Sequence, residues 1–161
     1  MEAVILVGIQ ASGKSTFYKQ RFFDTHVRIS RDLLRTKNRE SLLMDACIRA
    51  QQPFVVDNTN PLAEERARYI LAARAARFRV VCYFFRTETR AAIARNSKRE
   101  GRARIPIPGI LGTYKKLEEP RPDEGFDEIC VVTLTPDGRV LIDQAFPAPS
   151  GAADDENSSL V

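Results

Sequence analysis

The chain alternates between short apolar runs and longer segments in which apolar residues recur with helical spacing. The runs at 3–7, 54–57 and 79–85 are rich in β-branched and aromatic residues, as buried strands are. A weaker run at 26–30 predicts a further strand. Helices are predicted at 14–23, 32–52 with an interruption near 36–38, about 61–77, 88–99 and 109–117.

Turn signals complete this outline. Thr59 or Asn60 would cap the helix that starts near Pro61, with proline in its first turn. The dipeptide Asp137-Gly138 predicts a hairpin between strands at 128–134 and 140–142. Strands that alternate with helices predict an α/β fold with a mainly parallel central sheet flanked by helices, in which right-handed crossovers bring the carboxyl ends of the strands to one edge.

The first strand is followed by the segment GIQASGKST, which matches the pattern G-x-x-x-x-G-K-[ST] in full. It stands between a predicted strand and a predicted helix, as a phosphate-binding P-loop requires. Its backbone N–H groups would cradle phosphate oxygens, Lys14 would reach the β- and γ-phosphates, and the Ser15 hydroxyl would bind Mg²⁺. The sequence therefore predicts ATP and Mg²⁺ as ligands, held by Gly8, Ala11, Ser12, Gly13, Lys14, Ser15 and Thr16.

Two carboxylates follow predicted strands, where they would lie beside Gly8 at the same edge of the sheet. Asp57 ends the run FVVD, which is the Walker-B pattern of an acid near Mg²⁺. Asp32 follows the second strand and is a candidate to orient a hydroxyl acceptor and accept its proton. The alternative for Asp32 is a helix N-cap, which is a common use of aspartate.

Basic residues concentrate between positions 86 and 104. Arg95, Arg99 and Arg102 recur at i, i+4 and i+7, which predicts one helical stripe of three guanidiniums able to hold an anion. The proline- and glycine-containing segment after it predicts a mobile loop, and together they form a candidate lid at about 88–108. The alternative is a solvated helix face, which is our interpretation of the arginines at 66–77.

Composition narrows the class of protein. The 161 residues suit one domain, predicted at 1–146, and no run is long and apolar enough for a membrane helix. The opening residues lack the pattern of a signal peptide, and three widely spaced cysteines suggest buried thiols in a reducing cytoplasm. Lys and Arg outnumber Asp and Glu by 25 to 21. Three of these acids lie in the segment 147–161, which we predict to be a disordered acidic tail. The domain without this tail is therefore more basic than the whole chain, which suits an anionic partner.

With these features together, the chain resembles the kinase domain of polynucleotide 5′-hydroxyl kinases, including the kinase half of polynucleotide kinase/phosphatase. The resemblance runs from about residue 4 to 134, through GIQASGKSTF, ISRDLLR, VVDNTNP, RNSKREGRARIP and EGFD. It implies a P-loop kinase fold with an Arg-rich helical lid and a C-terminal hairpin. It also implies Asp32 as general base, Arg35 as a contact to the acceptor phosphate, and Arg95 and Arg99 as lid arginines on the donor.

We therefore expect a cytoplasmic, ATP- and Mg²⁺-dependent kinase that phosphorylates the 5′-hydroxyl end of DNA or RNA. The expected catalytic residues are Lys14, Asp32, Arg95 and Arg99, with Arg35 and Asp57 at the substrate and Ser15 at the metal. Two alternatives stay open. One is a P-loop kinase of a small metabolite or nucleotide-sugar, and the other is a nucleotide-binding module without catalysis.

Overall fold

A single six-stranded sheet forms the centre of the computed structural model, which describes residues 1–147. The strands are β1 (Glu2–Val7), β2 (Val27–Ile29), β3 (Phe54–Asp57), β4 (Arg79–Phe85), β5 (Glu128–Leu134) and β6 (Val140–Phe146). Their order is β2-β3-β1-β4-β5-β6, in which β1 to β5 are parallel and β6 pairs antiparallel with β5 at the edge. The predicted parallel α/β sheet and its terminal hairpin are confirmed.

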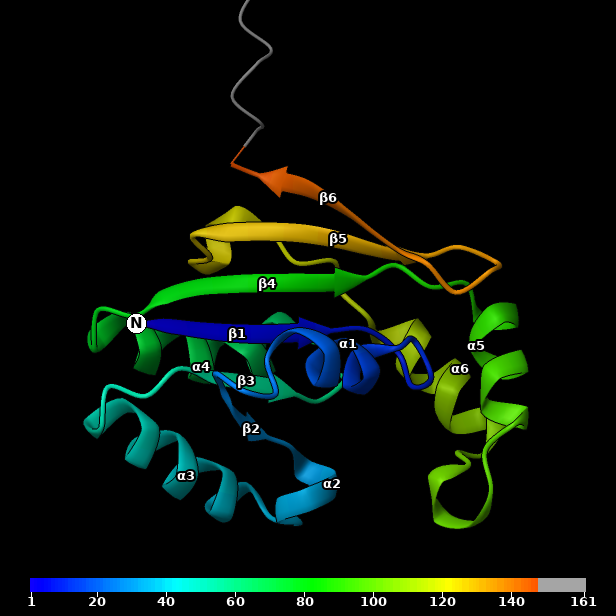
Figure 1. Cartoon of the computed structure of the whole chain (residues 1–161), viewed down its shortest axis with the longest axis horizontal. Helices are drawn as coiled ribbons and strands as arrows, with labels where there is room; N and C mark the ends of the chain where they lie inside the picture. The colour runs from blue at the N-terminus through cyan, green and yellow to red at the C-terminus, as the bar shows by residue number, and fades with distance from the viewer. Residues whose placement is uncertain (148–161) are drawn as a thin grey trace, which may run out of the picture.

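Helices cover both faces of this sheet and gather beyond its carboxyl edge (Figure 1). They are α1 (Lys14–Arg21), α2 (Arg31–Leu34), α3 (Lys37–Arg49), α4 (Ala63–Ala75), α5 (Thr89–Ser97) and α6 (Ile107–Lys116), with 3₁₀ turns η1 (Gly101–Ala103) and η2 (Pro122–Glu124). In Figure 1, α1 lies on one face and α4 on the other, whereas α5 and α6 stand past the tip of β1. This arrangement leaves the segments that follow β1, β2 and β3 at one end of the molecule.

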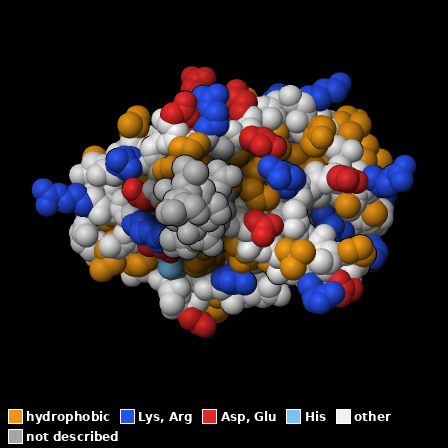
Figure 2. All heavy atoms as spheres, turned by 90° about the horizontal axis from the view of Figure 1, so that it is seen from above, with side chains coloured by type: hydrophobic (Ala, Val, Ile, Leu, Met, Phe, Trp, Pro, Cys, Tyr) orange, Lys and Arg blue, Asp and Glu red, His pale blue; other side chains and the backbone are white. Residues whose placement is uncertain are grey.

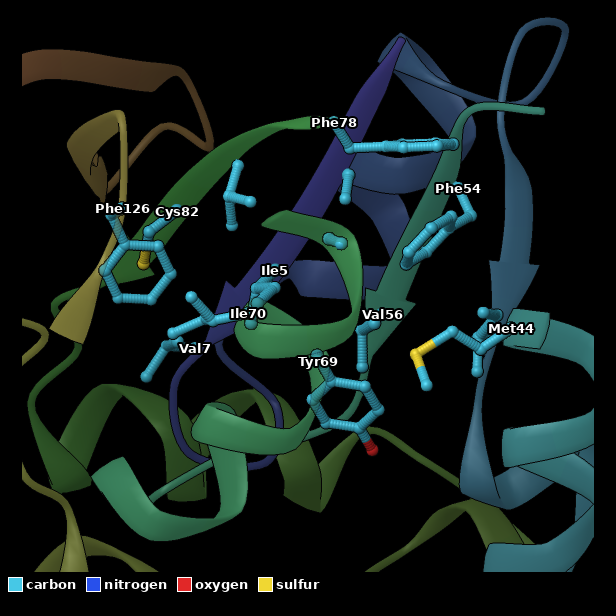
Figure 3. Packing of buried hydrophobic residues seen from close by; sticks show 14 of the residues in the cluster. Ile5, Val7, Met44, Phe54, Val56, Tyr69, Ile70, Phe78, Cys82 and Phe126 are labelled. Carbon is cyan, nitrogen blue, oxygen red and sulfur yellow. The ribbon is translucent and has the colours of Figure 1, made fainter. Parts of the chain in front are cut away.

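Apolar side chains pack on both faces of the sheet because alternate strand residues point to opposite sides. One cluster, under α3 and α4, includes Ile5, Val56 and Ile70, and Figure 3 shows them packed together. A second cluster, under α1, joins Phe17 to Leu6 and Phe85. The three cysteines, at positions 47, 82 and 130, are free and buried, as the sequence predicts.

Several predicted boundaries are wrong by a few residues. The break near 36–38 is confirmed: α2 ends at Leu34, Arg35 follows with a φ of 73°, and Thr36 caps α3 by accepting a hydrogen bond from the Arg39 N–H. The helix expected from Pro61 instead begins at Ala63, and neither Thr59 nor Asn60 caps it. Asn60 is used differently, because its amide is buried and donates to the Leu6 carbonyl over 2.7 Å.

The interpretation of the α4 arginines as a solvated face is wrong for Arg66. Its side chain is fully buried and forms two hydrogen bonds with the Glu124 carboxylate, of 2.8 and 2.7 Å. Its remaining nitrogen donates to three backbone carbonyls, those of Asn60, Pro61 and Glu118. Arg66 therefore ties the start of α4, beside the candidate site, to the segment before β5.

Replacing Arg66 with methionine should lower the free energy of unfolding by about 3–5 kcal/mol, because Glu124 would be left buried and uncompensated. Arg74→Met, on the same helix, is the control: its ion pair with Asp127 is about half exposed and contributes about 1 kcal/mol or less. Urea denaturation of the two variants measures the difference. Equal losses would show that the buried pair contributes no more than a surface pair.

Within residues 1–147, every helix is too short or too polar to cross a bilayer. Viewed toward the β6 edge, acidic and basic side chains are interspersed over the described surface (Figure 2). The predicted acidic tail from 147 onward lies, apart from its first residue, outside the described residues.

Candidate active site

The P-loop leaves β1 at Gly8 and enters α1 at Lys14. A Cβ at Gly8 would lie 2.9 Å from the Phe85 Cβ, and the Gly8 N–H donates to the Thr59 carbonyl over 3.0 Å. Gly13, with a φ of 96°, occupies the N-cap position of α1 and has no side chain that could cap the helix. The first N–H groups of α1 therefore lack a side-chain acceptor, and such a helix start suits a phosphate.

Lys14 turns back into this loop. Its Nζ donates to the carbonyls of Gly8 and Ile9 over 2.9 and 2.6 Å, and to the Ser12 hydroxyl over 3.2 Å. Burial lowers the pKa of Lys14 to about 8, against the opposing effects of the nearby carboxylates of Asp57 and Asp32. An anion bound in the loop would favour the charged ammonium and raise this pKa.

Ser15 and Asp57 meet where β3 ends beside α1. The Ser15 hydroxyl donates to the Asp57 carboxylate over 3.0 Å, as expected for a Walker-B acid beside the P-loop. Arg28, on β2, also binds this carboxylate, with distances of 2.8 Å from Nε and 2.7 Å from a terminal nitrogen. The hydroxyl and carboxylate oxygens are donors of the kind that Mg²⁺ prefers, so the pair fits the predicted metal.

Asp32 lies in the first turn of α2, where Ser30 occupies the N-cap position. The N-cap alternative for Asp32 is therefore wrong. Its exposed side chain lines a cavity of about 650 Å³ that extends from Gln10 of the P-loop to Ile105 of the lid. Since Asp32 also acts on the pKa of Lys14, the carboxylate stands close to the phosphate-binding loop.

The predicted lid contains α5, η1 and the start of α6. Its base is anchored to the P-loop, because Ile9 packs against Ala92 of α5 and Ile110 of α6. The buried Asn96 amide closes the intervening loop by donating to the Ile105 carbonyl over 2.7 Å and accepting from its N–H over 2.9 Å.

The lid arginines do not form one helical stripe. The helix ends at Ser97, so only Arg95 of the three lies on it, whereas Arg99 lies in the following loop and Arg102 lies in η1. Arg95 donates from Nε to the Ala11 carbonyl over 2.7 Å, and one of its terminal nitrogens is buried without a partner among the described residues. Arg99 is exposed, and its charge acts on the pKa of both Lys14 and Arg95.

One predicted residue lies apart from this group. Arg35 is exposed at the end of α2 and is not among the residues that line the cavity. Thr16 follows Ser15 on the first turn of α1, and both side chains are exposed beside the P-loop. The structure thus brings together Lys14, Ser15, Asp57, Asp32, Arg95 and Arg99, with Thr16 next to Ser15, and Arg35 lies outside the lining of the cavity.

Sequence reasoning missed four charged residues of the site. Arg28 binds Asp57, as described above. Arg31 and Arg68 line the cavity, and the buried carboxylate of Glu40 pairs with both. Glu40 recurs at helical spacing with the buried Met44 and Cys47, which is the one signal in the sequence that could have placed it inside.

A family model described as an AAA domain matches residues 4–110, which is more than half of the chain. The chain belongs to this family. Its P-loop, sheet order and flanking helices are those of a P-loop kinase fold, and the domain is a nucleotide-binding one.

Three proteins illustrate the similarity. The chain is 26% identical over 132 residues to the bifunctional polynucleotide phosphatase/kinase of Schizosaccharomyces pombe, covering 80% of this chain and 32% of that protein. It therefore spans about a third of that relative's length. A gluconokinase from Sinorhizobium meliloti matches with a TM-score of 0.60 at 17% identity over 82% of each chain. Chaetomium thermophilum Kti12, in complex with ADP-AlF3, matches with a TM-score of 0.60 at 16% identity over 81% of this chain and 88% of that one.

Proposed function

We propose that this protein is an ATP-dependent kinase that transfers the γ-phosphoryl group to the 5′-hydroxyl end of DNA or RNA. The observation that carries the proposal is the cavity that Asp32 lines together with Gln10 of the P-loop. A nucleotide-binding module without catalysis has no need of a carboxylate at that place. The similarity to the polynucleotide phosphatase/kinase of S. pombe supports a polynucleotide acceptor.

The residues divide into a donor side and an acceptor side. On the donor side, Lys14 and the start of α1 would hold the phosphates, and Arg95 and Arg99 would approach from the lid. Ser15 and Asp57 would hold Mg²⁺, which supplies neutralisation of charge on the β- and γ-phosphate oxygens. On the acceptor side, Asp32 would orient the hydroxyl, and the exposed Arg35 would contact the incoming strand outside the cavity.

These groups account for each bond that forms or breaks and for the proton that moves during the transfer. Asp32 accepts the proton of the 5′-hydroxyl as its oxygen forms a bond to the γ-phosphorus. The bond from the γ-phosphorus to the bridging oxygen breaks, and ADP leaves with that oxygen. Lys14 and the lid arginines stabilise the negative charge that spreads over the transferred group and the leaving oxygen.

A kinase of a small metabolite is the second candidate, and the size of the cavity favours it. About 650 Å³ lies within the usual range of small-molecule sites. The donor side would be unchanged, and the acceptor at Asp32 would be a small molecule instead of the end of a polynucleotide.

The experiment that decides is incubation of the protein with γ-labelled ATP and Mg²⁺, with a 5′-hydroxyl oligonucleotide in one arm and a metabolite mixture in the other. Label on the oligonucleotide, with an acceptor KM that rises steeply with salt, supports the polynucleotide assignment. Label only in the metabolite arm would replace it with the second candidate. No transfer in either arm would favour the non-catalytic module.

The kcat/KM for ATP should fall as the pH rises above about 8, because the free protein then loses the charge on Lys14. In the complex, the phosphates raise the pKa of Lys14, so kcat should stay level to higher pH. Rate profiles from about pH 6 to pH 10 measure both quantities. Lys14→Arg is the control, since a guanidinium keeps its charge throughout and its profile should lack the alkaline fall. A wild-type kcat/KM that stays level over this range would contradict the assignment.

A further inference from the structure

Glu40 is a carboxylate that no part of the proposed reaction uses. Its side chain is fully buried, although it carries a charge. It accepts hydrogen bonds from Arg31 Nε over 2.6 Å, from Asn58 Nδ2 over 2.6 Å, and from a terminal nitrogen of Arg68 over 3.1 Å. A second nitrogen of Arg31 also binds it, so Arg31 holds the carboxylate with two donors. A buried charge with this many partners fixes the positions of the groups around it.

Both arginines face the cavity on their other side. The side chains of Arg31 and Arg68 are 39% and 34% exposed, and both line the cavity that contains Asp32. Each guanidinium has five N–H donors in a rigid plane, and Glu40 occupies only part of them. Within residues 1–147, the side-chain hydrogen bonds of Arg31 go to Glu40 and those of Arg68 go to Glu40 and the Tyr69 hydroxyl, so each guanidinium keeps further donors that can meet a ligand in the cavity.

Tyr69 completes the support of Arg68. Figure 3 shows its ring at the border of the apolar cluster, with the hydroxyl turned away from the other labelled side chains. Arg68 donates to this hydroxyl, and its Cζ lies 4.4 Å from the ring centroid. Although burial opposes it, hydrogen bonds to Tyr69 and Glu40 raise the pKa of Arg68. The guanidinium is therefore held in place and charged before any acceptor arrives.

The charges of this network do not cancel. Two guanidiniums share one carboxylate, which leaves one positive charge in excess beside the cavity. The acidic residues of the cavity wall other than Asp32 are Glu64 and Glu65, and both are exposed, where water screens them. One anionic group with two or more oxygens would complete the network through charge-assisted hydrogen bonds.

We propose that Glu40 is a positioning residue, which holds Arg31 and Arg68 as a binding site for a phosphate group of the acceptor. This inference rests on the proposed function and deepens it, because it states where the acceptor's own phosphate lies. Asp32 lines the same cavity, so one acceptor molecule can present its hydroxyl to Asp32 and its phosphate to the two arginines. The inference places this contact inside the cavity, whereas Arg35 is not among the residues that line it.

Arg68→Lys is the variant that tests the inference most directly, because it keeps the charge and removes the rigid fork. With a 5′-hydroxyl oligonucleotide, the acceptor KM should rise about ten- to hundredfold, as expected for the loss of hydrogen bonds between charged groups. The kcat and the KM for ATP should stay within about threefold, because Arg68 contacts neither the donor nor the reacting atoms. Arg74→Lys, on the exposed side of the same helix, is the matched control and should leave the acceptor KM unchanged.

A binding measurement separates this inference from the proposed function. With ADP and Mg²⁺ present, the wild-type protein should bind thymidine 3′-monophosphate at least about tenfold more tightly than thymidine, and Arg68→Lys should lose most of this difference. Equal binding of the two compounds by the wild type would overturn the inference. If the phosphate-dependent binding is present but no label reaches any oligonucleotide, the proposed function fails and the inference stands.

Glu40→Gln is the second variant, since it removes the charge that holds both arginines. If it folds, as its thermal unfolding would show, its acceptor KM should rise at least as far as that of Arg68→Lys. A folded Glu40→Gln protein with a wild-type acceptor KM would overturn the positioning role. If it does not fold, the kinetic and binding results for Arg68→Lys decide the question alone.

Discussion

Replacing Lys14 with methionine should lower the rate of phosphoryl transfer by at least about a hundredfold, which corresponds to about 2.7 kcal/mol of lost transition-state stabilisation. The physical reason is the position of the ammonium. It lies inside the P-loop, in hydrogen-bond contact with the loop carbonyls, where a bound γ-phosphate gains charge during transfer. In a site from which water is excluded, the loss of one such charge is large.

Methionine is chosen because it fills the space of the buried lysine stem. The carbonyls of Gly8 and Ile9 lose a donor, at a cost of about 1–3 kcal/mol, but the protein no longer has to bury an ammonium. We therefore expect a small change in Tm. Lys19→Met, on the exposed face of α1, is the control and should keep wild-type activity. A Lys14→Met protein that retains more than about a tenth of the wild-type rate would contradict the donor site described here.

The sheet and the P-loop could be predicted because both are local patterns. A run such as Phe54–Asp57 is short, apolar and β-branched, and it lies between helical segments, so its place in a parallel sheet follows. The meeting of Ser15 with Asp57 also follows, since the carboxyl ends of parallel strands share one edge. The donor side of the candidate site was therefore visible in the sequence.

The buried charges could not be paired from the sequence. Glu40 and Arg66 both recur at helical spacing with buried apolar residues, a pattern that could have placed them inside, although from the sequence we interpret the arginines at 66–77 as solvated. Arg31 is nine positions from Glu40, but the other partners lie farther along the chain: Arg68 is 28 positions from Glu40, and Glu124 is 58 positions from Arg66. Only the tertiary fold brings such groups together, and for this reason most of the acceptor side was missed.

In the lid, the helical spacing of the arginines continues past the residue at which the helix ends, so the sequence predicts a helix that is too long. Arg95 and Arg99 have helical spacing, but the backbone leaves the helix after Ser97. The Asn96 side chain forms two hydrogen bonds with Ile105, and Gly101 adopts a φ of 57° between them. These non-helical contacts turn the chain into a loop, in which the Arg99 side chain donates to the Ala103 carbonyl over 3.4 Å instead of continuing a helical stripe.

Replacing Asp32 with asparagine should lower kcat about 10²- to 10⁴-fold, the range usual for loss of a general base. The amide has nearly the same shape, but it can neither accept the proton of the acceptor hydroxyl nor carry the charge. Because Ser30 rather than Asp32 occupies the N-cap position of α2, stability should change by only about 0.3–1 kcal/mol, from the interaction of the carboxylate with the helix start. The comparison therefore separates a chemical role from a structural one.

Glu64→Gln is the matched control, because Glu64 is an exposed acid that lines the same cavity. It should leave kcat within about threefold of the wild type, since it does not act on the reacting hydroxyl. A second consequence concerns the donor side. The charge of Asp32 raises the pKa of Lys14, so Asp32→Asn should move the alkaline fall of ATP affinity to lower pH. Titration of ATP binding against pH measures this shift without turnover. An unchanged kcat in Asp32→Asn would show that Asp32 takes no part in the reaction. Equal falls in kcat in Asp32→Asn and Glu64→Gln would show that the effect comes from the total charge of the cavity.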